Sequence, residues 1–482
     1  MRDFGVGRPG TVAPVERRTR GFAQRLGIVA LVALCVRVVY VLLFRIDLIP
    51  LGGDSVIYSL GANLLARGRG FVDPLDVFSP VFHQSADHPP LYLLWLAIPS
   101  FLDPGKGDTS QVVHMLWSCA LGTGTVVVCG LAGRRLAGAR CGLIAAAIAA
   151  VYPNVWVYDG GLLSETMSLF TVALVILLTY RFLQRPGGGR AAALGLACGL
   201  AALSRAELIL TLPLVLAPAV LLARAHEPAL GLRRLKWLAA GGVAALMIVT
   251  PWVAFNLSRF DESVYISTGF GGTLAAANCD ATYHGSGLGS KNYACGGAAF
   301  LAAERNANVP LATLDASEID AAVRAETMKY VRAHRGRLPV VVAARWGRIT
   351  GLFRPRQEMR LDALFYRKER GVMEAGFFSY YAVAALAVVG AVTLRRRRVP
   401  VFPLVAFPVI VLVSVGITFA QIRYRAPAEV SLVLLAAVAI DAVVRRRRAG
   451  ATGAAPPPVA QVPASRSTTG ANATIASSGT TQ

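Results

Sequence analysis

The chain alternates long apolar runs with short polar segments. A helix needs about 20 mostly apolar residues to cross the hydrocarbon core of a bilayer, which is about 30 Å thick. One run, residues 190–203, is shorter, so we expect it to be tilted, buried among its neighbours or re-entrant. The pattern predicts ten spans, at residues 26–45, 111–133, 141–157, 162–183, 190–203, 206–223, 237–257, 377–394, 401–420 and 429–444.

The first apolar run is interpreted as a retained span. It contains Arg37 and lacks the small-residue cleavage site of a secretory signal peptide. The stretch at residues 88–101 is also apolar, but we expect it to lie along the membrane without crossing. If it crossed, every later segment would change sides, and the Arg cluster at residues 134–140 would face outward, against the positive-inside rule.

Charge clusters between the spans predict the orientation. The predicted cytoplasmic segments hold 24 Lys or Arg residues, whereas the first external loop holds seven Asp and three Lys or Arg. Both termini are therefore predicted to be cytoplasmic. The sequence predicts an all-α polytopic membrane protein of the cell membrane, with a long first external loop and an external domain before the last three spans. Its expected parts are the N-terminus (1–25), first span (26–45), external loop (46–110), membrane bundle (111–257), external domain (258–376), C-terminal spans (377–444) and a disordered cytoplasmic tail (445–482).

Composition excludes a soluble globular protein. Of 482 residues, 55% are hydrophobic and only 16% are charged, whereas about a quarter are charged in soluble domains. A net charge of +22 would suit a nucleic-acid partner. The basic residues, however, lie in short clusters between apolar runs, so we interpret them as determinants of membrane topology and expect no nucleic-acid partner.

Two of the seven cysteines, Cys279 and Cys295, lie in the large external segment, and the others lie in or beside the predicted spans. An external compartment is oxidising, so the pair is predicted to form a disulfide. Closing a loop of this length contributes about 3 kcal/mol in the chain-entropy model. A metal site is the weaker alternative, because no CxxC spacing occurs and His284 is the one nearby histidine.

Candidate chemistry gathers directly after the first span. The motif Leu51-Gly-Gly-Asp54 is followed by Tyr58, and a turn-rich stretch then leads to Asp87-His-Pro-Pro-Leu-Tyr92. An Asp flanked by glycines near the membrane stands where water meets lipid headgroups, which suits a catalytic base. The structural alternative is that Asp54 caps the helix-like run that follows it.

These motifs, in this order, resemble the polyprenyl-phosphate-sugar-dependent membrane glycosyltransferases of the GT-C fold. That superfamily includes the protein O-mannosyltransferases and the lipid A aminoarabinose transferases. The resemblance covers residues 46–225 well and the C-terminal spans loosely, while residues 258–376 resemble only a variable outer domain. Its further elements are Val151-Tyr-Pro-Asn, Asp159-Gly-Gly-Leu-Leu-Ser-Glu165, Gly199-Leu-Ala-Ala-Leu-Ser-Arg205 with Ala206 in place of the usual Pro, and Arg423-Tyr-Arg425-x-Pro427.

The resemblance implies a role for each residue of these motifs. Asp54 would be the general base, and Glu165 the second acid that orients the acceptor or the sugar. His88 stands where the aminoarabinose transferases carry a phosphate-pairing Lys, and a His adds positive charge only when it is protonated. The implied substrate and donor-phosphate residues are His88, Tyr58, Arg205, Arg423 and Arg425.

The physical chemistry of such a transfer requires the same kinds of group. A base removes the acceptor proton as the anomeric carbon is attacked from behind, which contributes about 10²–10⁴-fold. A single displacement inverts that carbon. The departing lipid phosphate gains negative charge, so fixed cations or hydrogen-bond donors must face it.

A plainer interpretation exists for each of the other residues. Glu165 could merely cap or solvate its loop together with Asp159, and His88 could be an interfacial histidine. Arg205 could simply pair with Glu207. The pair Arg423 and Arg425 could be helix-end anchors that snorkel to the membrane surface.

The predicted function is therefore transfer of a mannose- or arabinose-type sugar from a polyprenyl phosphate to an acceptor hydroxyl at the outer face, with inversion and with Asp54 as base. The acceptor is a protein, a lipid or a glycan. No cofactor is expected, and no dense carboxylate cluster indicates a divalent cation. A lipid or solute transporter is the alternative, although no internal repeat supports it. A non-enzymatic scaffold is a third hypothesis.

Overall fold

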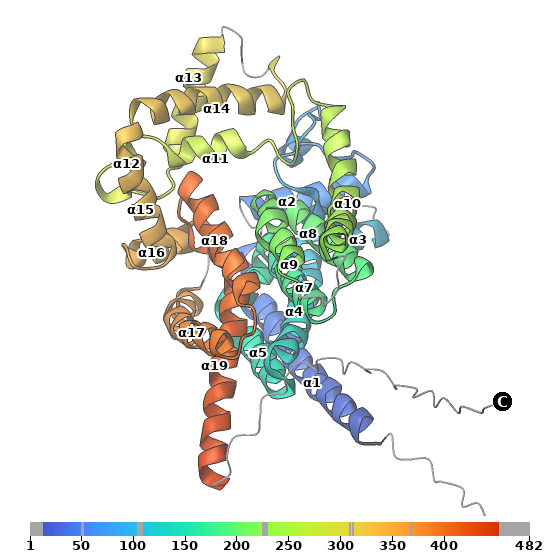
Figure 1. Ribbon diagram of the computed structural model, residues 1–482. Coiled ribbons are helices and arrows are strands. Elements are labelled where there is room, and N and C mark those ends of the chain that lie inside the picture. Colours follow the sequence, from blue (N-terminus) through green and yellow to red (C-terminus); the bar gives the residue numbers. More distant parts are fainter. Residues whose placement is uncertain are drawn as a thin grey trace, which may run out of the picture.

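In the computed structural model, the described part of the chain comprises residues 13–49, 53–103, 109–223, 230–307, 310, 313–366 and 369–452. Helices make up most of it (Figure 1). Its β-structure is limited to one isolated bridge between Val72 and Gln84. The prediction of an all-α polytopic membrane protein is confirmed.

Six of the described helices are each long and apolar enough to cross a bilayer. Each of the ten apolar runs falls on helical structure, although the run 141–157 is divided between the helices Ala139–Val151 and Pro153–Trp156. The number ten stays a prediction, because it depends on four shorter segments. The long helices are α1 (Ala13–Phe44), α4 (Gln111–Ala137), α7 (Glu165–Gln184), α10 (Leu230–Leu257), α17 (Arg370–Arg396) and α19 (Ala426–Thr452). The shorter segments are α5 (Ala139–Val151), α8 (Gly188–Ser204), Ala206–Leu221 with α9 (Ala217–Leu221) at its end, and α18 (Phe402–Ile417).

Three short helices lie between these segments. The stretch expected to lie along the membrane forms α3 (Pro90–Leu102), and α2 (Asp54–Ala66) precedes it, while α6 (Pro153–Trp156) follows α5. The predicted tail falls mostly on residues 453–482, which lie outside the described residues, and α19 continues to Thr452.

Small residues let neighbouring helices pack with their backbones in contact. A Cβ placed on Gly195 of α8 would collide with the carbonyl of Gly241 on α10, and one on Gly390 of α17 would collide with the carbonyl of Leu435 on α19. Van der Waals packing through such small residues is a main source of helix association in lipid, where apolar burial alone offers no gain. These two close approaches fix the pairing of α8 with α10 and of α17 with α19.

Charges inside the bundle are paired. Arg37 on α1 is fully buried, and its Nε lies 2.8 Å from Oδ2 of Asp159. Near the opposite end of the bundle, Nε of Arg140 on α5 lies 2.6 Å from Oδ1 of Asp441 on α19. A buried charge is tolerated when an opposite charge and hydrogen bonds compensate its lost hydration. The intramembrane Arg37 therefore joins helices and needs no transport role.

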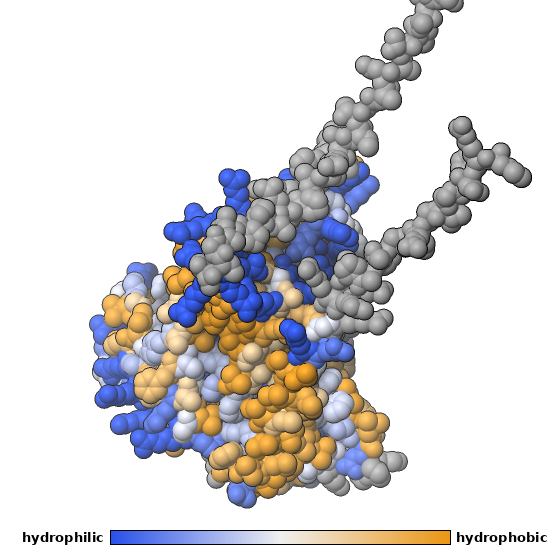
Figure 2. Space-filling model, turned by 90° about the horizontal axis from the view of Figure 1, so that it is seen from below, coloured by the Kyte–Doolittle hydropathy of each residue, from blue (hydrophilic) through white to orange (hydrophobic). Residues whose placement is uncertain are grey.

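The outer surface of the bundle is apolar. Figure 2 shows, from below, broad hydrophobic areas bordered by hydrophilic ones. A membrane-embedded surface is expected to look like this, because lipid tails solvate apolar side chains. Exposed large apolar side chains occur on several of the long helices, among them Ile28, Leu31, Leu43, Leu246, Met247, Val388 and Val389.

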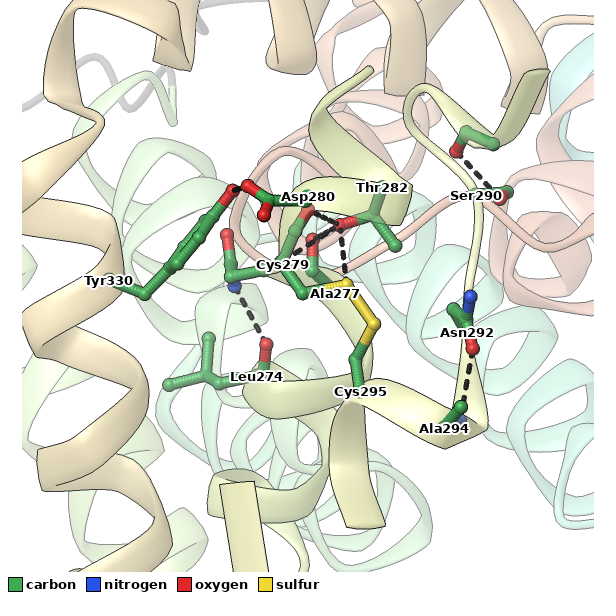
Figure 3. The surroundings of a disulfide bond; sticks show 12 residues. Leu274, Ala277, Cys279, Asp280, Thr282, Ser290, Asn292, Ala294, Cys295 and Tyr330 are labelled. Carbon is green, nitrogen blue, oxygen red and sulfur yellow. Dashed lines mark hydrogen bonds between the residues drawn. A yellow bond between two sulfur atoms is a disulfide. The ribbon is translucent and has the colours of Figure 1, made fainter. Parts of the chain in front are cut away.

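The segment before the last three predicted spans forms its own group of helices at the top of Figure 1. Its Cys279 and Cys295 are joined by a disulfide, as predicted (Figure 3). Arg345 of this group is buried and donates hydrogen bonds to the carbonyls of Ala277 and Gly416, so it ties the group to the end of α18. The helices are α11 (Phe270–Ala277), α12 (Asp280–Tyr283), α13 (Tyr293–Ala307), α14 (Ala316–Ala333), α15 (Leu338–Ile349) and α16 (Pro355–Tyr366).

The Arg37–Asp159 pair gives a test of the bundle. Arg37→Met leaves the buried Asp159 without its counter-charge, and we expect it to lower the stability of the folded protein by about 3–5 kcal/mol. Replacing both residues, with Arg37→Met and Asp159→Leu, removes the uncompensated charge and should recover much of that loss. Thermal unfolding of the detergent-solubilised variants measures this. A double variant less stable than the single one would contradict the assignment.

Candidate active site

Asp54 is the first residue of α2, and the position that precedes the helix is Gly53, at φ +61°. Such a φ favours glycine, because a side chain there would clash with the backbone. The carboxylate of Asp54 reaches across to the C-terminal part of the chain, where its Oδ2 lies 2.6 Å from Nη1 of Arg423. Asp54 therefore takes part in a tertiary ion pair and does not occupy the cap position.

Arg423 joins the two predicted acids. It lies on the short 3-10 turn Ile422–Arg425 that leads into α19. Besides contacting Asp54, its Nε lies 3.4 Å from Oε1 of Glu165. Its side chain is 8% exposed. One guanidinium thus lies between two carboxylates that are more than 100 residues apart in sequence.

Glu165 begins α7 and is fully buried. Its Oε1 also lies 2.5 Å from Nη1 of Arg205, which follows α8. Arg205 pairs in turn with Glu207 at 2.6 Å, and its guanidinium lies 4.8 Å from the ring centre of Tyr424. The expected Arg205–Glu207 pair is present, and the same guanidinium also belongs to the acidic cluster. Glu165 is the contact that joins Arg205 to Arg423.

Asp159 does not join this cluster. Its carboxylate accepts hydrogen bonds from Arg37 and from the hydroxyl of Thr166. A Cβ on Gly122 of α4 would collide with this carboxylate, so the glycine makes room for it. Of the two acids in the second motif, the structure brings only Glu165 to Asp54 and Arg423.

His88 lies on the other side of Asp54. Its Nε2 is 3.9 Å from Oδ2 of Asp54, and its Nδ1 is 2.8 Å from Oδ2 of Asp87. Burial acts to lower the pKa of His88, but the two carboxylates outweigh it and raise the pKa above its ordinary value. Tyr58 packs against His88 with ring centres 4.9 Å apart. His88 is thereby poised to carry positive charge, and Asp87 is the partner that sequence reasoning quoted without giving it a role.

The cations around Asp54 set its protonation state. Burial acts to raise its pKa, but Arg423 and then His88 oppose burial and hold the pKa well below the ordinary range of an aspartate. Asp54 is therefore ionised at neutral pH. An ionised carboxylate is the form that a general base requires, although its basicity is low while Arg423 is bound to it.

Arg425 points away from the cluster. Its Nε lies 2.5 Å from Oε1 of Glu429, and its guanidinium lies 3.4 Å from the ring centre of Tyr380. It also donates to the carbonyl of Ile349. This placement does not support the prediction that Arg425 binds the donor phosphate together with Arg423. The two arginines, two residues apart, face opposite sides of one turn.

Lys291, which the sequence analysis did not single out, also acts on this cluster. Its positive charge acts to lower the pKa of both Asp54 and Asp87. Its ammonium donates to the hydroxyl of Tyr293 at 2.6 Å and lies 4.9 Å from the ring centre of Phe419. The sequence offered one signal for this residue: lysine is uncommon here, with only five lysines among the 49 basic residues of the chain.

Metal ligands do not converge in the described part of the chain. Among these residues, no group of three His, Cys, Asp or Glu side chains is arranged to hold a metal ion. The carboxylates of the cluster instead face arginines. That a divalent cation is not required stays a prediction.

A comparison with protein families identifies part of the chain. Residues 87–255 match the model of the dolichyl-phosphate-mannose-protein mannosyltransferase family. The matched range contains His88, Glu165 and Arg205, and it begins after Asp54 and ends before Arg423. It confirms the resemblance to polyprenyl-phosphate-sugar-dependent glycosyltransferases over that range. No curated protein sequence matches the chain.

Several solved structures are similar to this chain. One is the archaeal oligosaccharyltransferase AglB from Archaeoglobus fulgidus, in complex with an inhibitory peptide and a dolichol-phosphate, at 15% identity and a TM-score of 0.49. The match covers 91% of this chain and 52% of that one, so this chain spans about half its length. Another is ArnT from Cupriavidus metallidurans bound to undecaprenyl phosphate, at 16% identity and a TM-score of 0.42, covering 89% of this chain and 80% of that one.

From the ion pair between Arg423 and Asp54 we predict that removing Arg423 raises the pKa of Asp54. Removing the guanidinium with Arg423→Met leaves burial as the main influence on Asp54, so its pKa should rise by about one unit or more. Carbodiimide labels only the protonated acid, and mass spectrometry of labelled protein across a pH series measures the midpoint. The matched control is Arg425→Met, which changes an arginine two residues away on the same turn. Equal midpoints in the two variants would contradict the assignment.

Proposed function

We propose that this protein is an integral-membrane glycosyltransferase that moves a sugar from a polyprenyl-phosphate donor to an acceptor hydroxyl. The observation that carries the proposal is the cluster in which Arg423 lies between Asp54 and Glu165. It combines a partly exposed carboxylate with the buried cation Arg423 beside the membrane helices. The family match over residues 87–255 supports the same chemistry.

Asp54 is the base of the proposed reaction. It takes the proton of the acceptor hydroxyl while the hydroxyl oxygen forms a bond to the anomeric carbon. The bond between that carbon and the phosphate oxygen breaks on the opposite face, and its electron pair leaves with the lipid phosphate. The products are an inverted glycoside, a polyprenyl phosphate and a protonated Asp54.

Arg423 links donor binding to the basicity of Asp54. In the structure described, its guanidinium is 2.6 Å from the Asp54 carboxylate. A donor phosphate competes with Asp54 for this cation, because planar guanidinium groups bind phosphate oxygens in pairs. When Arg423 turns to the phosphate, the pKa of Asp54 rises, and the carboxylate becomes a better base. Arg423 then also stabilises the negative charge on the leaving phosphate.

Glu165 is proposed to position the two arginines. It is fully buried and uses one carboxylate oxygen to contact both Arg205 and Arg423. A buried acid whose Oε1 faces two arginines is held as their counter-charge, because moving a proton onto it would leave both buried cations less well compensated. Glu165 therefore holds the phosphate-binding cations at the correct spacing, a role narrower than orientation of the acceptor or the sugar. His88 lies next to Asp54, and Tyr58 packs against His88.

The sugar is proposed to be of the mannose or arabinose type. The name of the matched family favours mannose on a dolichyl-type phosphate and a protein acceptor. Lipid and glycan hydroxyls are the other acceptor classes. The proposed site faces the outside of the cell membrane and both termini lie in the cytoplasm, an orientation that the arginine clusters between the spans support.

Replacing the base tests the mechanism. Asp54→Asn keeps the size of the side chain but cannot accept a proton, so we expect transfer to fall by about 10²-fold or more. The assay follows sugar label and released lipid phosphate from polyprenyl-phosphate mannose and then from its arabinose analogue, with a cell-envelope extract as acceptor. Asp47→Asn, an exposed acid near the same membrane face, is the matched control.

Two outcomes would contradict this function. Undiminished transfer by well-folded Asp54→Asn would exclude Asp54 as the base. Movement of unconverted lipid or solute across sealed vesicles, without release of lipid phosphate from either donor, would instead support the transporter. A transferase converts its substrate on one side of the membrane.

A further inference from the structure

Lys291 extends from the outer group of helices toward the cluster. Its ammonium lies 4.9 Å from the ring centre of Phe419, and that ring stacks on Tyr424 with ring centres 5.3 Å apart. The guanidinium groups of Arg423 and Arg205 lie 5.3 Å and 4.8 Å from the ring centre of the same Tyr424.

Lys291 lies inside the loop closed by the Cys279–Cys295 disulfide, four residues before the second cysteine. Its neighbours Ser290 and Asn292 lie on the segment that passes the disulfide in Figure 3. The remaining charged residues of the cluster come from α2, the segment before α3, α7, the segment after α8 and the turn before α19.

The backbone around Lys291 is held at several points. The amide of Asn292 donates to the carbonyl of Ala276 at 2.9 Å, and the carbonyl of Gly289 accepts from the amide of Ala420 at 3.3 Å. The second bond ties the loop to the segment that carries Arg423, three residues further along the chain. The backbone of Lys291 is thus held in place relative to Arg423 before any ligand binds, which lowers the entropy cost of binding.

The charges of the cluster do not balance without Lys291. Its four carboxylates outnumber its two arginines, and an anionic phosphate adds further negative charge. Among the basic side chains of the cluster, His88 and Lys291 are the two that can gain positive charge by taking up a proton, because the arginines are always charged. The carboxylates are Asp54, Asp87, Glu165 and Glu207, and the permanent cations are Arg205 and Arg423.

The surroundings of Lys291 leave its amine only partly protonated at neutral pH. Burial first, and then the charge of Arg423, lower its pKa to about 7, while Asp54 and Asp87 act in the opposite direction. The groups that face it from the packed elements are those two acids, the neighbouring His88, Arg423 with Tyr424, and the phenol of Tyr293 on α13. A lysine can titrate in this range and an arginine cannot.

We propose that Lys291 binds the phosphate of the lipid-linked donor and takes up a proton from solvent as it does so. The inference rests on the proposed function, because it assigns a residue to the donor side of the same site. The ammonium form pairs with the phosphate, and the phosphate in turn stabilises the ammonium form. Donor affinity must therefore fall as pH rises through neutrality and Lys291 loses its proton.

The test measures binding of a simple probe by the full-length protein in detergent. Farnesyl methyl phosphate is suitable because it is a phosphodiester, like the donor, and keeps one negative charge between about pH 6 and pH 9. Any pH dependence of its Kd then comes from the protein. The variants are Lys291→Met, which removes the cation, and Lys291→Arg, which keeps the charge at every pH. Lys329→Met, on the exposed face of α14, is the matched control.

We expect the wild-type Kd to rise by about tenfold between about pH 6 and about pH 8.5. Lys291→Met should bind about tenfold more weakly at the lower pH, because it lacks a charge-assisted contact, and should lose most of the pH dependence. Lys291→Arg should bind well at both ends, with only the contribution of His88 left. Lys329→Met should behave as wild type.

Two results would overturn the proposal. One is a Lys291→Met protein that binds the probe with the wild-type Kd and pH profile. The other is a Lys291→Arg protein that keeps the full wild-type pH dependence. Sugar transfer is assayed in parallel: transfer with an unchanged Kd in Lys291→Met removes this inference alone, whereas Lys291-dependent binding without any transfer removes the glycosyltransferase and leaves the phosphate site.

Discussion

The guanidinium of Arg423 is the contact on which the site depends. It lies 2.6 Å from Asp54 and 3.4 Å from Glu165, and so it joins the start of α2, the start of α7 and the turn before α19. Two buried or half-buried carboxylates would repel each other without a shared cation. The same contact keeps the pKa of Asp54 low, so one interaction governs both the architecture of the site and the protonation state of that acid.

The charged residues of this protein form two kinds of group: pairs that stabilise the helical bundle, and the partly exposed cluster around Asp54. The Arg37–Asp159 pair lies fully buried within the helical bundle, where it satisfies charges that lipid cannot hydrate. Arg140 is 31% exposed at the predicted cytoplasmic end of α5, and its partner Asp441 also pairs with Arg445. The cluster of Asp54, Glu165 and the arginines Arg205 and Arg423 instead mixes paired and partly exposed groups, since Asp54 is 27% exposed. A cluster of charges that is held together by competing contacts can be rearranged by an anionic ligand, whereas a closed buried pair cannot.

The outer group of helices contributes to the site as well as covering the bundle. Its disulfide-closed loop carries Lys291 to the acids, and Arg345 fastens the group to the end of α18 through backbone carbonyls. The region with the least recognisable sequence thus supplies a cation to the region with the most recognisable motifs.

The sequence by itself determined the membrane class, the positions of the helices, the disulfide and the candidacy of Asp54 and Glu165. Those features follow from local properties: the length of apolar runs, the compartment of two cysteines and the spacing of motifs. Only the tertiary structure showed that Glu165, and not Asp159, contacts Arg423. It also showed that Arg423 faces the acids whereas Arg425 does not, and that Lys291 lies near the cluster. The physical reason is that the direction of a side chain on a turn is set by packing against elements far away in sequence, and hydropathy and spacing carry no record of it.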